Sequence, residues 1–359
     1  MSNQHGRNSP CWCGSGRKYK HCHLRREQQD RLPIPAIKSN LRRHFRQQRG
    51  CLFPKCPRDA IQSHTIQRGG AIREIVDFEN HVLTFYPVTN DVDCLPSLHR
   101  RGWKKASTFL GFCNNHDTTV FSPLESDPFT ASPEQLFLLA YRAHCHELYQ
   151  KRSVLSSQDV YRDLGDRGVT TDKQMAFQSL SDSMFAGATK ALGELTKLKK
   201  VMDGDLLSRN YQNWRSCVFQ FSGPLSVTGT GAFTPNVDLD GLPLQTLHDP
   251  SAKIHYLYYA AVPCGEGCAV AFVWHNEHSY AHAFIESVRK LDVDLIPHTL
   301  LQFLFAYCEN TYFSQKWWDG LLDCGRQQIR ILAGVGNPYY DDFEFVTDGI
   351  APWRLTEMS

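Results

Sequence analysis

The middle of the chain has the apolar spacing of two long helices. A Ser-Pro-Glu sequence at residues 132–134 supplies an N-cap, a proline at the first helical position and an acidic first turn, so a helix is expected to begin there. This helix is expected to run through Arg152, with apolar residues at positions 136, 138, 139, 141 and 148. A second helical pattern opens at Thr171 and covers residues 173–200. Two consecutive long helices predict an antiparallel helical hairpin, which we place at residues 131–204.

From about residue 205 onward, β-branched and aromatic residues gather in short runs, which is the pattern of strands. Two of the runs are joined by Cys264-Gly265-Glu266-Gly267, whose composition is typical of a hairpin turn. The expected strands are 214–221, 255–263, 268–275 and 328–334. The expected helices are 279–291, 297–311 and 315–323. Residues 205–359 therefore predict an α+β domain that is large enough for its own core, although no motif in it discloses a task.

Composition then narrows the class of protein. With 42% hydrophobic and 21% charged residues, the chain has the balance of a folded protein and not of a disordered one. Its longest apolar runs, 256–263 and 268–274, are far shorter than the ~18–20 residues that cross a bilayer. The N-terminal sequence is polar and lacks the apolar segment of a secretory signal. These features predict a cytoplasmic protein without a membrane span.

The net charge of +2 hides a strong asymmetry. Residues 1–50 carry twelve Lys and Arg against two Asp and Glu, whereas residues 51–359 carry 27 against 35. A basic arm ahead of an acidic body favours a polyanionic or acidic partner for the arm. A helix within the arm would carry Arg42, Arg46 and Arg49 on one face, which could follow phosphates. A solvated linker that is basic for solubility is the alternative.

The thirteen cysteines are grouped in a way that favours metal binding. In a reducing compartment, clustered cysteines bind metal more often than they form disulfides. Gly14 and Gly16 allow a positive φ, so the chain can turn back between the cysteines before them, Cys11 and Cys13, and the Cys22-His23 pair after them. A segment this short buries no core of its own, and zinc would have to supply most of its folding free energy. The first cluster, which can complete a tetrahedral structural zinc site, is Cys11, Cys13, Cys22 and His23.

Residues 10–23 closely resemble the SEC-C zinc module, which is found at the C-terminus of the SecA translocation ATPase and as an addition to many bacterial proteins. The family pattern is P-C-x-C-G-S-G-x-K-Y-K-x-C-[CH], and every fixed position is present in this chain. The resemblance implies zinc bound by the first cluster. It also implies a docking module whose exposed basic face, here Lys18, Tyr19 and Lys20, contacts the ribosome or an export chaperone.

A second set of soft ligands is spread over a longer segment. Cys51 and Cys56 could form a knuckle, and Cys113 and His116 could stand at the start of a helix. Two such pairs separated by a β-hairpin make a treble-clef zinc site. We name these four residues the second cluster, and the two clusters together predict two zinc ions per chain.

Residues 51–125 distantly resemble the core of an HNH-type nuclease. In that family a cysteine pair precedes a histidine on a strand, and a second pair precedes a helix with a metal-binding residue. The resemblance implies that His64 acts as general base and that Asp117 binds a divalent cation such as Mg²⁺. It also implies that an asparagine, which could be Asn90, Asn114 or Asn115, orients the side chain of His64. Such an enzyme would be an endonuclease, of a mobile-element or phage-defence type.

A purely structural zinc finger is the alternative for the same residues. His64 would then brace the knuckle, with Ser63 and Thr65 bonded to nearby backbone. His116 would be a structural ligand only. Basic and aromatic side chains at residues 99–105 suit a nucleic-acid contact in either case.

The patterns divide the chain into five expected domains. These are the SEC-C module at 1–30, a basic linker at 31–50, a treble-clef or HNH-like zinc domain at 51–130, the helical hairpin at 131–204 and the α+β domain at 205–359. The expected function is that of a cytoplasmic zinc-binding protein whose SEC-C module docks on a macromolecular partner, namely the ribosome, a nucleic acid or a chaperone. The alternative is an HNH-like metal-dependent nuclease, so the sequence leaves open whether the protein is an enzyme.

Overall fold

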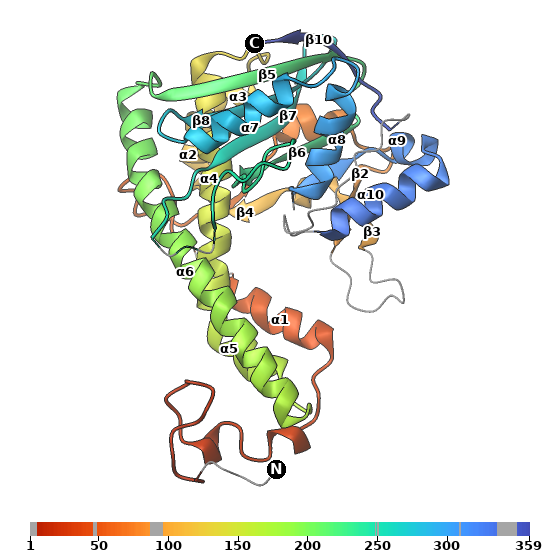
Figure 1. Cartoon of the computed structure of the whole chain (residues 1–359). Helices are drawn as coiled ribbons and strands as arrows, with labels where there is room; N and C mark the ends of the chain where they lie inside the picture. The colour runs from red at the N-terminus through yellow and green to blue at the C-terminus, as the bar shows by residue number, and fades with distance from the viewer. Residues whose placement is uncertain are drawn as a thin grey trace. The chain divides into compact units, whose positions relative to one another are not determined.

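The fold is that of a computed structural model, shown in Figure 1. Helices and strands are both abundant, and the α+β class expected from the sequence is confirmed. The structure describes residues 6–45, 49–86, 96–247, 249, 251–308, 310–335 and 350–359. The chain forms two compact units. Unit 1 comprises Met1–Gln48 and Gln150–Gly193, and unit 2 comprises Arg49–Tyr149 and Glu194–Ser359. The domain boundaries given above stay predictions.

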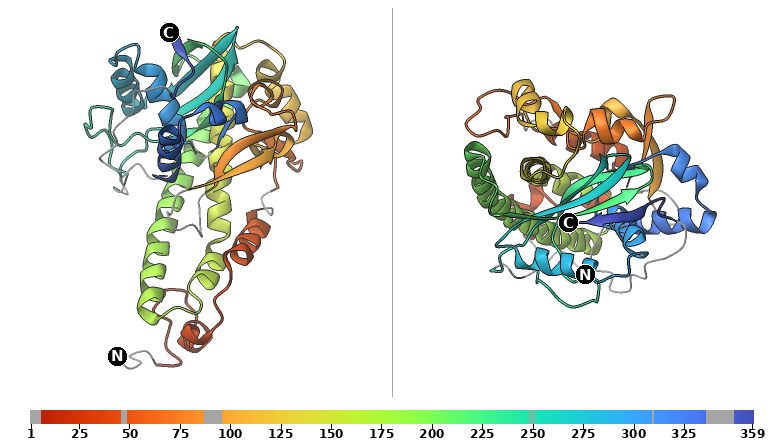
Figure 2. Two further views of the ribbon diagram at one scale, coloured as in Figure 1. Left: turned by 90° about the vertical axis from the view of Figure 1, so that its right-hand side faces the viewer. Right: turned by 90° about the horizontal axis from the view of Figure 1, so that it is seen from above.

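Unit 2 is built on an antiparallel sheet to which eight strands of the described residues belong (Figure 2). The strand order is β10-β5-β8-β7-β6-β9-β2-β3. The strands are β2 His81–Tyr86, β3 Ser97–Gly102, β5 Trp214–Ser222, β6 Val227–Phe233, β7 Leu257–Cys264, β8 Gly267–His275, β9 Thr311–Phe313 and β10 Arg354–Met358. The central strands β7 and β8 are buried along nearly their whole length, which indicates that both faces of the sheet are covered.

Helices cover the two faces of β7. Tyr258 hydrogen-bonds His144 of α4 (Pro133–Ser156) with an Oη–Nδ1 distance of 2.7 Å. The next residue, Tyr259, contacts Phe303 of α8 (Ile296–Ala306) with ring centroids 5.0 Å apart. Because successive residues of a strand point to opposite faces, α4 and α8 lie on opposite sides of the sheet. The other helices near the sheet are α7 Ser279–Arg289, α9 Gln315–Gly320 and α10 Asp323–Val335.

One predicted strand, 328–334, is wrong, because these residues belong to α10. Polar and apolar residues alternate at the start of this stretch, which is a strand pattern over so short a window. The packing follows helical spacing instead: Ile329 and Leu332 are buried, whereas Ile331 is 44% exposed. Ile329 and Leu332, three positions apart, thus lie on the buried side of α10, and this helix is in contact with α8.

Residues that surround the second cluster form the expected treble-clef-like arrangement. The strand β1 (Gln62–His64) pairs antiparallel with β4 (Thr108–Leu110), and α2 (Asn114–Val120) follows directly, ahead of α3 (Ser122–Glu125). Between β1 and β4 the chain contributes β2 and β3 to the large sheet. The long insert between the two ligand pairs is therefore part of the main core of unit 2.

The helical hairpin is confirmed and is longer than expected. It consists of α4 and α6 (Thr171–Ser208), with α5 (Gln158–Gly165) between them. Tyr141 donates to Asp203, and His144 hydrogen-bonds the carbonyl of Leu195. Residue numbers rise on one helix as they fall on the other, so the helices are antiparallel. Neither these helices nor any other described helix is long and apolar enough to cross a membrane.

Unit 1 combines the N-terminal segment with α5 and the adjoining turns of α4 and α6. Its α1 (Ile34–Phe45) packs against α5, and two 3₁₀ turns, at Tyr19–His21 and Arg26–Gln28, precede it. The predicted helical face with Arg42, Arg46 and Arg49 is wrong, because Arg49 lies outside the helix. Arg46 is not among the described residues.

Candidate metal centres

The first cluster is assembled by a tight loop in unit 1. Gly14 and Gly16 have φ values of 72° and 70°, which glycine adopts without strain. They turn the chain back so that the amide of Cys11 donates to the carbonyl of Arg17 over 2.8 Å. As a result, the four ligand atoms of the cluster all lie within 4.8 Å of one another.

The donor set and its spacing fit zinc. The sulfurs of Cys11 and Cys22 each lie 3.2 Å from Nδ1 of His23, and the sulfur of Cys13 lies 3.5 Å from that of Cys22. Ligands at ordinary Zn–S and Zn–N distances stand about 3.5–3.8 Å apart in a tetrahedron, so a small relaxation would admit the ion. Thiolates and imidazole favour Zn²⁺ over Mg²⁺. The first cluster could therefore hold zinc.

The thiols of the first cluster resist simultaneous ionisation. Burial raises the pKa of Cys11 to about 12, and the neighbouring sulfurs add to the rise. Burial also raises the pKa of Cys13, but hydrogen bonds involving Ser15 and the other two thiols outweigh this and bring its pKa to about 7. A bound dication would stabilise all three thiolates, and its binding would release protons.

Asp166, which directly follows α5, also belongs to this site, although no sequence pattern indicates it. Its Oδ2 lies 2.9 Å from Nε2 of His23, and the side chain is fully buried. Burial raises the pKa of Asp166, but hydrogen bonds from His23, Gln178 and Arg26 more than offset this, so its pKa is lowered overall. Because the two partners are 143 residues apart in the sequence, no local spacing could have linked them.

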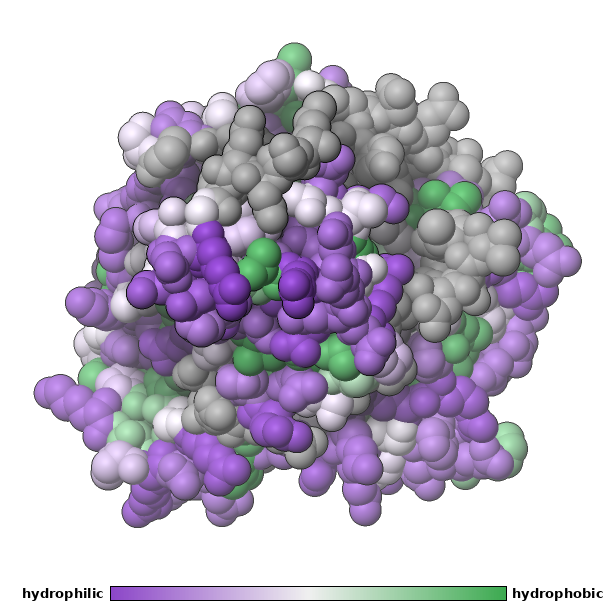
Figure 3. Space-filling view, turned by 90° about the horizontal axis from the view of Figure 1, so that it is seen from below, coloured by the Kyte–Doolittle hydropathy of each residue, from purple (hydrophilic) through white to green (hydrophobic). Residues whose placement is uncertain are grey.

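The basic face of the module is smaller than the resemblance implied. Arg17 and Lys18 are exposed and Lys20 is half-buried. Tyr19, however, is only 8% exposed and packs on the cysteines of the first cluster. The prediction that Tyr19 lies on the exposed face is wrong, because its ring supplies core to a module that has little other apolar surface. The side of the protein seen in Figure 3 is predominantly hydrophilic.

The second cluster also comes together, within unit 2. Nδ1 of His116 lies 3.5 Å from the sulfur of Cys51 and 3.4 Å from that of Cys113, and the sulfurs of Cys56 and Cys113 are 3.9 Å apart. All four ligand atoms lie within 4.8 Å of one another. The donors are the same as in the first cluster, so this set could hold zinc too.

The knuckle of the second cluster is held by a buried lysine on α6. The ammonium of Lys199 donates to the carbonyl of Leu52 over 2.8 Å and to Tyr141 over 3.0 Å, and it pairs with Asp203. Lys199 is only 7% exposed, and a buried charge is tolerated when its donors are satisfied in this way. The long helix thus fixes the position of the residue next to the ligand Cys51.

His64 and Asp117, the predicted catalytic pair, lie on β1 and α2, outside the second cluster. Nε2 of His64 and Oδ1 of Asp117 are both buried without a hydrogen-bond partner among the described residues. Burial, followed by the charge of Arg68, lowers the pKa of His64 to about 4, whereas burial raises the pKa of Asp117. The charges of Arg68, Arg142 and Glu125 affect the pKa of both His64 and Asp117, so the two side chains lie near the same three charged residues.

The two interpretations also involve the candidate asparagines and the sequence neighbours of His64. Asn114 and Asn115 are exposed, and Asn90 lies outside the described residues. Ser63 and Thr65 both hydrogen-bond nearby backbone, as the structural interpretation expects.

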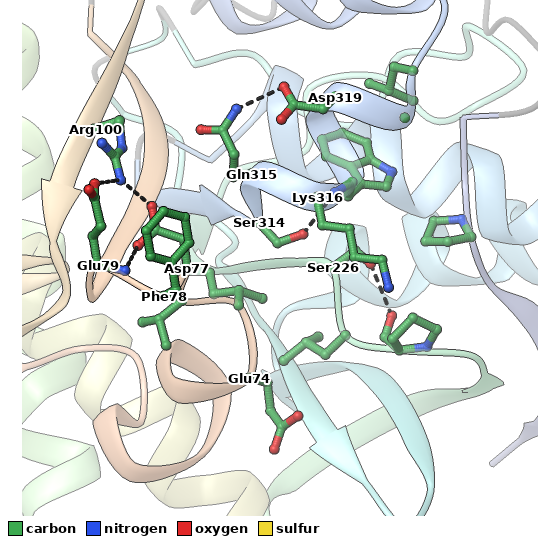
Figure 4. A pocket seen from close by; sticks show the side chains of 18 of the residues that line it. Glu74, Asp77, Phe78, Glu79, Arg100, Ser226, Ser314, Gln315, Lys316 and Asp319 are labelled. Carbon is green, nitrogen blue, oxygen red and sulfur yellow. Dashed lines mark hydrogen bonds and ion pairs between the residues drawn. The ribbon is translucent and has the colours of Figure 1, made fainter.

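A third set of close ligand atoms belongs to Asp77, Glu79 and His81. The first two residues border a pocket of about 1030 Å³ in unit 2, together with Phe78, which is 94% exposed (Figure 4). Arg100 pairs with both carboxylates. Since the arginine already supplies the positive charge there, we assign no metal to this set.

Comparison with known proteins supports the interpretation of the first cluster. A family model described as SEC-C motif matches residues 7–25, which include all four residues of the cluster. No curated protein and no solved structure matches the chain. The chain therefore carries a SEC-C motif at residues 7–25, with a Cys11, Cys13, Cys22 and His23 cluster that could bind zinc.

Proposed function

We propose that the SEC-C motif docks this protein on a negatively charged macromolecule, with the ribosome, a nucleic acid and an acidic chaperone surface as candidates. The observation that carries the proposal is the exposure of Arg17 and Lys18 on a loop bounded by the ligands Cys13 and Cys22. A loop that is already closed by its ligands loses little conformational entropy when it binds, which favours its use as a contact surface.

Charge around the motif supports the same proposal. The segment 6–31 exposes five cationic side chains against two acidic ones. The cations are Arg7, Arg17, Lys18, Arg25 and Arg31. Arg17 lies 3.9 Å from Asp163, but an exposed pair of this kind contributes little and leaves the guanidinium free to bind a partner. The cysteines among the described residues form no disulfide bonds, which suits a reducing compartment, so we also propose a cytoplasmic location.

Reversing one charge on this face tests the docking. Lys18→Glu is expected to weaken binding to purified ribosomes or to total RNA. The affinity should also depend less steeply on salt: the slope of log affinity against log salt concentration should fall by about 1 for each phosphate that the variant no longer neutralises. Lys290→Glu, an equal change on an exposed residue of unit 2, is the control and should leave binding unchanged. Equal affinities of both variants and the original protein at every salt concentration would contradict the proposal. Binding that survives on an acidic protein but not on RNA would point to the chaperone.

The second candidate function is metal-dependent cleavage of nucleic acid by an HNH-like site. It is favoured by the two buried, unpartnered atoms of His64 and Asp117. With a pKa of about 4, His64 is neutral at pH 7 and has a lone pair available as a base. Arg68 lies over Trp103, with 5.7 Å to the ring centroid, so a cation and an aromatic ring suited to nucleic acid are close to this site.

Divalent-dependent cleavage of DNA or RNA tests this candidate. His64→Ala should abolish cleavage in the presence of Mg²⁺ or another divalent cation while both zinc ions are retained, since His64 is not in either cluster. His282→Ala changes an exposed histidine of unit 2 and should cleave normally. If no substrate is cut, or if His64→Ala cuts as well as the control, the enzymatic function is excluded and the second cluster is a structural finger.

A further inference from the structure

The imidazole of His23 is held from both of its nitrogens. Nδ1 faces the first cluster, 3.2 Å from the sulfurs of Cys11 and Cys22. Nε2, on the opposite side of the ring, lies 2.9 Å from Oδ2 of Asp166. A histidine that binds a metal through one nitrogen commonly gives its other N–H to a carboxylate, which fixes the tautomer and raises the basicity of the ligating nitrogen.

The carboxylate of Asp166 is built into unit 1 and is not a chance surface neighbour. It accepts hydrogen bonds from Nε of Arg26 and, over 2.7 Å, from the amide of Gln178 on α6. The side chain of Asp166 has no exposed surface, and Arg26 and His23 are 3% and 5% exposed. A buried carboxylate with three donors is held at one place and one orientation.

The same contacts join the module to the turn between α5 and α6. The guanidinium of Arg26 donates to the carbonyls of Arg162 and Asp163 at the end of α5. The amide of Gly168, past the end of that helix, donates to the carbonyl of Arg26 over 3.2 Å. Arg26, three residues after the last ligand His23, and the loop that carries Asp166 therefore hold each other in place.

We propose that Asp166 is the positioning residue of the N-terminal metal site, which keeps His23 in the Nε2–H form with Nδ1 directed at the metal and couples metal binding to the order of the α5–α6 turn. The SEC-C motif of this chain is then one part of a metal-dependent unit whose other part lies 143 residues away. Coupling of this kind is reciprocal: the ordered turn strengthens metal binding, and the bound metal stabilises the turn. The inference concerns metal binding alone and holds whether or not the motif docks on a partner.

Zinc competition on the full-length protein tests the positioning role. Asp166→Asn keeps the size and one acceptor oxygen but removes the charge, and it should weaken one of two zinc sites by roughly 10- to 100-fold. The second cluster, in unit 2, serves as an internal reference and should keep its affinity. Asp163→Asn is the matched control, because Asp163 also pairs with Arg26, whereas the carboxylate bonded to His23 is that of Asp166. Unchanged affinity of both sites in Asp166→Asn, or an equal loss in Asp163→Asn, would overturn the proposal.

Two further measurements distinguish positioning from general support of the fold. The ¹⁵N shifts of the His23 ring should report the Nε2–H form in the zinc-loaded protein and a mixture of forms in Asp166→Asn. In the original protein, removal of zinc from the first cluster should speed amide exchange at residues 158–178. Exchange there that does not respond to zinc would refute the coupling, and this measurement needs no variant to fold.

Discussion

Replacing Cys13 with serine is expected to reduce the zinc content of the protein from two ions per chain to one and to unfold residues 7–25. The buried apolar core of this segment consists of Cys11, Cys13 and Tyr19, so two of its three members belong to the cluster that could bind the ion. Structural zinc contributes about 10–16 kcal/mol of apparent binding free energy in modules of this size, and no packing of three side chains replaces it.

Elemental analysis and limited trypsin digestion check this expectation. In Cys13→Ser, tryptic cleavage after Arg17 and Lys18 should become fast, because the loop that holds them is no longer closed. Cys324→Ser changes an exposed cysteine away from both clusters and should retain two ions and slow cleavage. Two ions in Cys13→Ser, or no zinc in the original protein, would show that the first cluster is not a zinc site.

Replacing Cys113 with serine should remove the other ion and destabilise unit 2 without unfolding it at ambient temperature. The ion would join two short segments whose ligands are 57 to 65 residues apart in the sequence. Other contacts remain in this variant: the amide of Ile61 donates to the carbonyl of Phe112 over 2.7 Å, and Phe112 packs on Phe121. A loss of about 3–5 kcal/mol would lower Tm by about 10 °C in a unit of this size.

Calorimetry together with zinc analysis measures this effect. Cys217→Ser makes the same chemical change at a fully buried cysteine that belongs to neither cluster, and it should keep both ions. A Cys113→Ser variant with two ions per chain would contradict the second site. A Tm decrease no larger than that of Cys217→Ser would show that the ion adds little to the stability of unit 2.

Short-range spacing made much of the candidate chemistry predictable. The ligands Cys11, Cys13, Cys22 and His23 fall within one short loop, where the positions of cysteines and glycines largely fix the geometry. The start of α4 followed from its N-cap and Pro133, because helix signals are local. The second cluster was predictable only as two pairs, since nothing in the sequence brings residue 51 close to residue 113.

The sequence by itself therefore determined the first ligand set, the two separate pairs of the second set, the long helices and the α+β class, all of which depend on residue type and near spacing. Tertiary structure alone decided which groups surround the ligands. It placed Asp166 beside His23 and brought the ammonium of Lys199 into a hydrogen bond with the carbonyl of Leu52, next to Cys51. It also buried Tyr19, which the resemblance to the motif had assigned to the surface. The physical reason is that burial and hydrogen bonding between distant segments depend on how whole elements pack, and no periodicity within one segment encodes its partner.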